Sequence, residues 1–133
     1  MKLTTKSEYS ILALLYMARQ PKDKYVKVDE IVAACDIPKK YLELLLMTLR
    51  QHRIIKTRRG NQGGYQLARP AGEISLASII RLMDGALAPT ESVSTYFHSE
   101  TPLSKEPVLL AVFKDIRDYI ANTLESLTLE KLI

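Results

Sequence analysis

Apolar residues recur every three or four positions near the start of the chain, which is the spacing of one face of a helix. This pattern predicts a first helix from about Thr5 to Arg19, stopped by Gln20-Pro21. Thr5 and Glu8 have the spacing of a capping box at its start. A short strand is expected afterwards at Tyr25-Val26. The residues of this helix that are expected to face a core are Tyr9, Leu12, Leu15 and Tyr16.

Two more helical patterns follow, separated by the short turn Asp36-Ile37-Pro38. The first covers roughly Val28 to Cys35, and the second runs from Pro38 to about His52. Two helices joined by so tight a turn predict a helix–turn–helix whose later member is the recognition helix. The inward residues are expected to be Ile31, Ala34 and Cys35 in the first helix, and Leu42, Leu45, Leu46 and Leu49 in the second.

A pair of strand-like runs comes next, Ile54–Thr57 and Tyr65–Leu67, joined by a segment rich in glycine. Glycines at such a tip predict a hairpin whose turn has positive φ angles. Arg58 and Arg59 stand just before the turn, and guanidinium groups are attracted to the negative potential of a narrow minor groove. The hairpin and the helix–turn–helix together predict a winged helix that binds DNA.

The rest of the chain predicts two helices separated by a long loop. Ser75 caps a helix over Leu76–Asp84, which Gly85 ends. The segment Ala86–Pro107 is rich in Ser, Thr and Pro and is expected to be a structureless loop, functional or disordered. The last helix, about Val108–Ser126, needs a partner for a seam like that of a coiled coil. The seam consists of Leu109, Phe113, Ile116, Ile120, Leu124 and Leu127.

These elements predict a mainly α fold with a small β-hairpin, organised in three parts. Residues 1–85 form a winged helix-turn-helix DNA-binding domain, residues 86–107 an effector or sensor loop, and residues 108–133 a dimerisation helix and tail. The alternative for the last helix is that its seam packs back on its own domain. The predicted subunit interface consists of Leu109, Phe113, Ile116, Ile120 and Leu124.

The charges divide along the chain in the same way. Residues 1–69 hold 14 Lys and Arg against 6 Asp and Glu, a balance of +8, and residues 70–133 hold 5 against 9, a balance of −4. A basic first half favours a polyanionic partner, although an overall charge of +4 also serves solubility. No apolar run approaches the ~20 residues needed to cross a bilayer. With no signal-peptide pattern at the start, a cytoplasmic location is expected.

The predicted DNA contacts come from the recognition helix, the wing and the N-terminus. Glu43 is expected to accept a hydrogen bond from a cytosine amino group, or else to pair on the surface with Lys39 or Lys40. Lys39, Lys40 and Arg50 are expected to contact phosphates. The full set is Lys2, Lys39, Lys40, Tyr41, Glu43, Arg50, Arg58, Arg59, Gly60, Gly63 and Gly64.

Four motifs resemble the Rrf-type winged-helix transcription regulators, the family of the bacterial iron–sulfur cluster regulator, the nitric-oxide-sensing repressor and the cysteine-metabolism repressor. They are the opening Met1–Lys6, the run Tyr41-Leu42-Glu43, the wing Arg59–Pro70 and the run Ile79–Gly85. The resemblance covers nearly the whole chain and implies a homodimer, joined by the last helix, on a near-palindromic operator. The family often has glutamine at position 44 and serine at position 38, where this chain has Leu44 and Pro38, which leaves the operator sequence open. Leu44 is expected either to meet a thymine methyl group or to lie in the core.

Relatives that hold an iron–sulfur cluster have three cysteines in the loop before the last helix. The segment 86–107 has none here, and His98 is its only soft ligand, so the chain resembles the cluster-free branch and no metal or cofactor is expected. The single cysteine, Cys35, excludes an intramolecular disulfide. A buried thiol is the favoured interpretation of Cys35, with a redox sensor as the alternative.

No catalytic constellation stands out. His52 and His98 lack a nucleophile or carboxylate partner at a recognised spacing, so the chain is not expected to be an enzyme. The sequence predicts a sequence-specific DNA-binding repressor that binds its operator as a homodimer. Its signal is expected to be a small-molecule effector or a protein partner. The alternative is a winged-helix protein-interaction module that has lost DNA binding.

Overall fold

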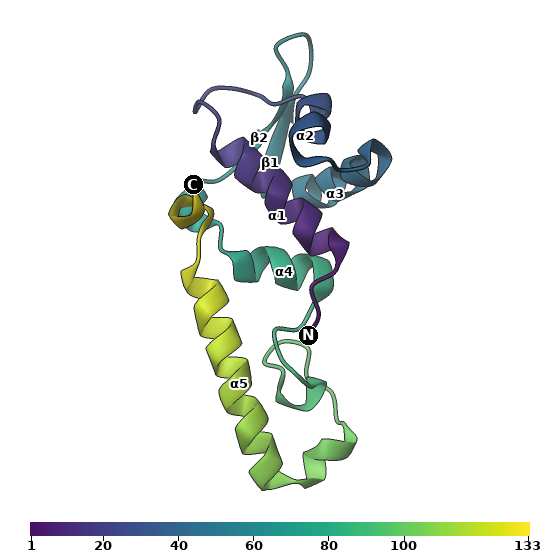
Figure 1. Cartoon of the computed structure of the whole chain (residues 1–133), viewed down its shortest axis with the longest axis vertical. Helices are drawn as coiled ribbons and strands as arrows, with labels where there is room; N and C mark the ends of the chain where they lie inside the picture. Colours follow the sequence, from purple (N-terminus) through teal and green to yellow (C-terminus); the bar gives the residue numbers. More distant parts are fainter.

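A head of three helices and a hairpin, with a long helix running away from it, makes up the computed structural model, which describes all 133 residues (Figure 1). Helix α4 lies beneath α1. Four short 3₁₀ helices lie between or after these elements, at 71–73, 91–93, 102–105 and 129–132. The helices and strands are α1 (Thr5–Ala18), α2 (Val28–Cys35), α3 (Lys39–Gln51), β1 (Ile55–Arg58), β2 (Gly64–Leu67), α4 (Leu76–Asp84) and α5 (Pro107–Ser126).

The core of the head lies between α1, α2, α3 and the hairpin. The predicted leucine stripe of α3 is confirmed, because Leu42, Leu45, Leu46 and Leu49 are all buried. Side chains from every neighbouring element complete this core, among them Leu14, Ile31, Ile37, Ile55 and Ile74. Burying such a stripe against three elements fixes how α3 is presented at the surface.

The start and the buried face of α1 differ from the prediction. The helix is capped by Thr4, whose hydroxyl accepts a hydrogen bond from the Lys6 amide at 3.2 Å, so the capping box at Thr5 is wrong. Of the four residues predicted to face the core, Tyr9, Leu15 and Tyr16 are partly buried against it, but Leu12 is 43% exposed. The buried residues of α1 are Ser7, Ser10, Ala13, Leu14 and Met17. Small residues on this face allow α4 to pack closely, which hydrophobic periodicity alone does not register.

The face of α2 that packs on the core contains fewer buried residues than predicted. Ile31 is buried, Ala34 is exposed and Cys35 is half-buried. The Cys35 thiol lies 3.8 Å from the carbonyl oxygen of Leu12 on α1. Burial raises the pKa of this thiol, although the charge of Arg19 acts in the opposite direction, and a raised pKa disfavours the reactive thiolate.

The wing is a two-stranded antiparallel hairpin with a third segment at its edge. Ile55 pairs with Leu67 and Arg58 with Gly64, so each strand begins one residue from its predicted bound. The expected strand at Tyr25-Val26 is present as a single bridge, in which Val26 and Tyr65 exchange two backbone hydrogen bonds of 2.7 Å. This bridge ties the hairpin to the segment before α2.

The segment between α4 and α5 is ordered by its own packing, so the prediction of a structureless loop is wrong. It contains two short 3₁₀ helices, and Ser92, Val93 and Ser94 are buried. The guanidinium of Arg117 on α5 donates to the Val93 carbonyl oxygen at 2.9 Å. The ends of α4 agree with the prediction, with Ser75 at the cap and Gly85 (φ 90°) after the last turn.

After α5 the chain returns to the head. Thr128 bridges to Ser75, and the Leu129 amide donates to the Ile74 carbonyl oxygen at 3.0 Å. The Leu129 side chain is fully buried among the residues of the main core. The segment predicted as part of a separate dimerisation unit therefore completes the core of the head.

Candidate nucleic-acid interface

The outward face of α3 consists of the residues left outside by the leucine stripe. An open groove lies between this face and Tyr65 of β2. Leu44 is 61% and Met47 55% exposed, so the expectation that Leu44 is core is wrong. The groove is lined by Lys40, Glu43, Leu44, Leu46, Met47, Arg50 and Tyr65. A helix with both charged and apolar side chains outward suits hydrogen bonds to base edges and contacts with thymine methyl groups.

The carboxylate of Glu43 makes no ion pair. The predicted surface alternative, a pair with Lys39 or Lys40, is not formed, because Lys39 pairs with Asp29 of α2 at 3.0 Å instead. The hydrogen bond with Asp29 and its charge raise the pKa of Lys39. Glu43, Lys40 and Arg50 therefore remain available to a ligand, and Lys39 is partly compensated within the chain.

Two glycines let the wing form against its neighbours. A Cβ on Gly63 would lie 2.0 Å from the Arg58 carbonyl oxygen across the turn. A Cβ on Gly64, which has a φ of +143°, would lie 2.4 Å from the Val26 carbonyl oxygen. Lys27 also donates to the Gly60 carbonyl oxygen at 3.1 Å, which holds the tip against the start of α2. The backbone geometry of the tip therefore requires glycine at these two positions.

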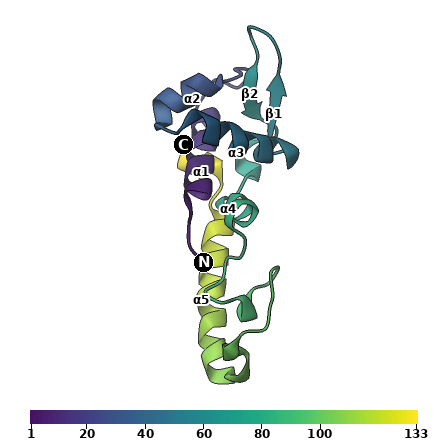
Figure 2. The ribbon, with the colours of Figure 1, turned by 90° about the vertical axis from the view of Figure 1, so that its right-hand side faces the viewer.

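The two arginines of the wing have different surroundings. The Arg58 guanidinium lies 5.5 Å from the centre of the Tyr25 ring, a cation–π contact within the chain. Arg59 is exposed and makes no side-chain hydrogen bond or ion pair. Figure 2 shows the tip of the hairpin projecting above α3. Arg59 is thus the cation at the turn that has no partner within the chain and remains available to a ligand.

Tyr41 and Lys2 lie away from the groove. Tyr41 packs edge-to-face on Tyr9 of α1, with ring centres 5.7 Å apart, so it positions α3. The N-terminus lies beneath α4, at the opposite end of the head from the wing (Figure 1), where the Met1 ammonium donates to the Ala88 carbonyl oxygen at 3.1 Å. Lys6 lines a hollow beside Tyr41 and Thr48, a cation near the recognition helix that the sequence interpretation missed.

Asp84 at the end of α4 holds the start of α1. Its carboxylate accepts hydrogen bonds from the Thr4 amide (2.9 Å), the Thr4 hydroxyl and the Ser7 hydroxyl (2.8 Å). Partial burial acts to raise the pKa of Asp84, but the hydrogen bonds from Thr4 and Ser7 and the nearby charge of Lys6 together lower it. The orphan amides at the start of a helix are natural partners for such an anion.

A leucine-striped recognition helix packed on two other helices, beside a basic hairpin, defines a winged helix-turn-helix DNA-binding protein. The sequence profile of the Rrf2 family, described as iron-dependent transcriptional regulators, matches residues 3–133. The chain belongs to the Rrf2 family. It is a DNA-binding transcription regulator and not an enzyme.

Individual relatives agree with this assignment. A Synechocystis protein assigned as an HTH-type transcriptional regulator is 39% identical over 132 residues, which are 99% of this chain and 87% of that protein. The regulator NsrR of Halalkalibacterium halodurans is 30% identical over 135 residues, covering 100% of this chain and 90% of that protein. The structure of CymR, the global cysteine regulator of Bacillus subtilis, matches with a TM-score of 0.86 at 28% identity, covering 99% and 95% of the two chains.

The family description raises the question of iron, and the residues of this chain do not fit an iron–sulfur cluster. No group of three or more His, Cys, Asp or Glu side chains gathers anywhere in the structure. The only cysteine is on α2, and the segment before α5 holds hydroxyl groups instead. Three of them, Thr90, Ser92 and Thr101, hydrogen-bond to one another. Cluster binding requires thiolate or imidazole ligands, which this segment does not gather.

The longest helices do not suit a bilayer. None is both long and apolar enough to span a membrane.

Proposed function

We propose that this regulator is a repressor that binds a near-palindromic operator as a homodimer. Two winged heads joined by their long helices would place two recognition helices in successive major grooves. The observation that carries the proposal is the apolar surface of α5. This helix has twenty residues and none of them is buried.

The apolar residues of α5 form two stripes. One stripe, which includes Ile120 and Leu124, packs on Ala77, Ile80 and Leu87 of the same chain. The other stripe is exposed, with Val108 83% and Tyr119 75% accessible. It consists of Val108, Leu109, Val112, Ile116 and Tyr119. An exposed apolar stripe along a helix is typical of a protein interface, and a second copy of α5 is its natural partner.

The predicted interface residues divide between these stripes. Leu109 and Ile116 lie on the exposed stripe, whereas Ile120 and Leu124 face α4, and Phe113 is half-buried. Val108, Val112 and Tyr119 were missing from the prediction, because a single seam with a spacing of three and four was assumed. The proposed interface is centred on the exposed stripe.

Sedimentation together with operator binding tests the proposal. The protein is expected to sediment as a dimer at micromolar concentration. It is also expected to bind a duplex with two half-sites far more tightly than a duplex with one, and to reduce transcription from a promoter that carries them. Sedimentation as a monomer would contradict the proposed dimer. Increased transcription from the promoter would contradict the proposed repressor.

The segment 86–107 is the proposed place of the signal, because it packs on both α4 and α5. Arg81 of α4 stacks on the Tyr96 ring at 4.9 Å and pairs with Glu125 of α5 at 2.7 Å. A small molecule or a protein partner that displaced Tyr96 would alter the relation of α4 to α5. Replacing Tyr96 with Ala is expected to leave basal DNA binding intact and to change the response to the signal.

A further inference from the structure

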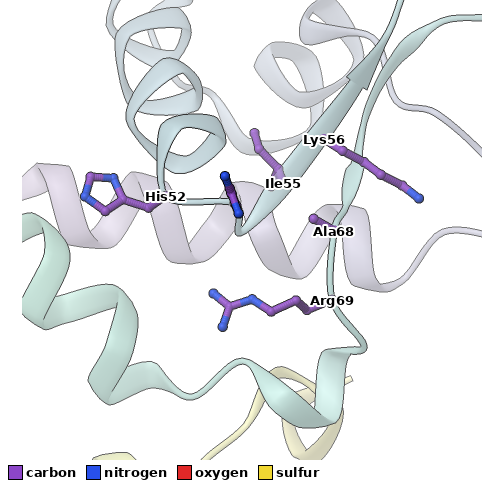
Figure 3. Close-up of a pocket in the computed structure, with 6 residues that line it drawn as sticks. His52, Ile55, Lys56, Ala68 and Arg69 are labelled. Carbon is purple, nitrogen blue, oxygen red and sulfur yellow. The ribbon is translucent and has the colours of Figure 1, made fainter.

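A basic hollow lies between the end of α3 and the base of the hairpin, outside the residues assigned above to DNA contacts. The residues that line it are His52, Arg53, Ile55, Lys56, Ala68 and Arg69. No acidic residue lines the hollow. Figure 3 shows the Arg69 side chain extending across the hollow toward the side of His52, whereas Lys56 points away from both. The cations available inside are therefore Arg53 and Arg69.

The charges of these two arginines are not compensated within the chain. Every ion pair of the structure involves other residues, so neither guanidinium has a carboxylate within 4.0 Å. The Nδ1 atom of His52 lies 3.0 Å from the Thr48 carbonyl oxygen. Because a carbonyl only accepts, Nδ1 carries the hydrogen, so the N–H of His52 is used within α3 and the two arginines are the donors left to a ligand. A concave surface lined by charges of one sign strengthens the attraction for an anion.

The backbone at Arg53 is fixed by the way α3 ends. Arg53 directly follows the C-cap of α3 and has a φ of 58°, the left-handed conformation that glycine adopts without strain. Its amide donates to the Arg50 carbonyl oxygen at 3.0 Å. The Ile54 amide also donates to the Leu49 carbonyl oxygen at 3.0 Å, so the left-handed residue closes the C-terminal end of α3 in a Schellman motif. This cap fixes the backbone from which the Arg53 side chain extends.

We propose that Arg53 and Arg69 form a phosphate-binding site. Guanidinium groups match phosphate oxygens with paired hydrogen bonds, and two of them lining one hollow provide several donors. The phosphate comes either from the DNA backbone beside the segment that α3 contacts, or from a free phosphorylated small molecule. Only the first source depends on DNA binding by this protein.

Two variants remove the cations, and a third serves as the control. Arg53→Gly removes one charge and also relieves the strain at a φ of 58°, so its melting temperature is expected to stay the same or rise. Arg69→Gln removes the second charge. Lys114→Gln makes the same change of charge on α5, at an exposed residue without an ion pair. All three are used as the full-length chain.

The first measurement is the affinity for duplex DNA as a function of salt. If the phosphate belongs to DNA, Arg53→Gly and Arg69→Gln are each expected to weaken binding by about 2- to 10-fold. The slope of log affinity against log salt is expected to fall by about 1 for each lost contact, equally for operator and unrelated duplexes. Lys114→Gln is expected to change neither value.

The second measurement is made without DNA, by NMR titration with inorganic phosphate and pyrophosphate. If the ligand is a free phosphorylated molecule, pyrophosphate is expected to shift the amide resonances of residues 52–56 and 68–69, and Arg53→Gly to abolish the shift. The proposal is overturned if both measurements are negative, or if Lys114→Gln weakens DNA binding as much as the other variants. A wild-type chain that failed to bind any duplex would instead contradict the proposed repressor, and the titration would still decide the site.

Discussion

Single residues determine the shape and the charge of the wing. Gly64 lies where the hairpin meets Val26, and both the contact and the positive φ require a residue without a Cβ. Gly60 has a φ of +96°, but a Cβ at this position would meet no atom within 4 Å. Comparing substitutions at the two glycines therefore separates the free-energy cost of backbone strain from that of a steric clash.

Gly64→Ala is expected to lower the free energy of unfolding by about 2–3 kcal/mol, because the new methyl group must displace the Val26 backbone. Gly60→Ala is the matched control and is expected to cost about 1 kcal/mol through its φ alone. Urea unfolding of both variants measures the difference. Equal losses would mean that the bridge to Val26 contributes nothing to the stability of the wing.

Arg59→Ala is expected to weaken operator binding by about 1–3 kcal/mol without changing the melting temperature, because Arg59 makes no contact inside the chain that its loss would break. Arg58→Ala is the informative comparison. It also removes the stacking on Tyr25, so it is expected to lower the melting temperature as well. If Arg59→Ala bound the operator with unchanged affinity at ~0.1 M salt, the prediction that the wing contacts DNA would be wrong.

At the scale of elements, the sequence predicted the helices and strands whose buried face follows from the spacing of their apolar residues. The leucines of α3 and the ends of α4 follow from local rules, and so does the hairpin. The buried face of α1 does not, because Ser7 is a polar residue that is buried beside α4, where its hydroxyl donates to Asp84, 77 residues later. The second stripe of α5 was missed for a related reason, since Val112 and Tyr119 are apolar residues outside the seam that packs on α4.

The candidate site was predictable to a similar extent. The exposed face of α3 follows from the leucine stripe, and Glu43 was correctly placed on it. The pairing of Lys39 with Asp29 was not predictable, because it depends on the angle between α2 and α3. Lys6 was missed because its position beside Tyr41 arises from the crossing of α1 and α3.

The clamp between α1 and α4 gives a prediction with a pH dependence. Asp84→Asn is expected to lower the free energy of unfolding by about 1 kcal/mol near neutral pH, because it weakens the hydrogen bonds that cap α1. The pKa of Asp84 is lowered in the folded chain, so its contribution is complete above the usual carboxyl pKa and is lost as the pH falls through the lowered value.

Unfolding of the wild type and the Asp84→Asn variant between about pH 3 and pH 7 measures this contribution. The difference between the two curves is expected to shrink toward the acid end. Asp23→Asn is the control, an exposed carboxyl group without an ion pair. A constant difference at every pH would assign the effect of the variant to something other than the charge of Asp84.

For the whole molecule, the central question is the exposed stripe of α5. Ile116→Asp is expected to convert the proposed dimer into a monomer, because an unpaired charge is costly inside an apolar interface. Operator binding is expected to be lost with it, since the two heads are no longer held together. Asn122→Asp adds the same charge to the polar side of α5 and is expected to leave the dimer intact. A dimer that survives Ile116→Asp would place the interface elsewhere.

The metal content of the purified protein tests the prediction that it binds no iron–sulfur cluster. Protein purified without oxygen is expected to be colourless and to contain no iron or sulfide, because no set of cysteines is available to bind them. Its operator affinity is expected to be the same before and after treatment with a chelator. Iron at a stoichiometric level would overturn the assignment to the cluster-free branch.

The return of residues 127–133 to the head means that α5 is held beyond its C-terminal end as well as along its length. Arg117, in the middle of the helix, is hydrogen-bonded to the segment 86–107, and Leu129, shortly after the last turn, is buried in the core that orients α3. Leu129 therefore connects the dimerisation helix proposed above directly to the core that orients α3, and a chain cut after Ser126 would lose this connection together with part of the core of the head.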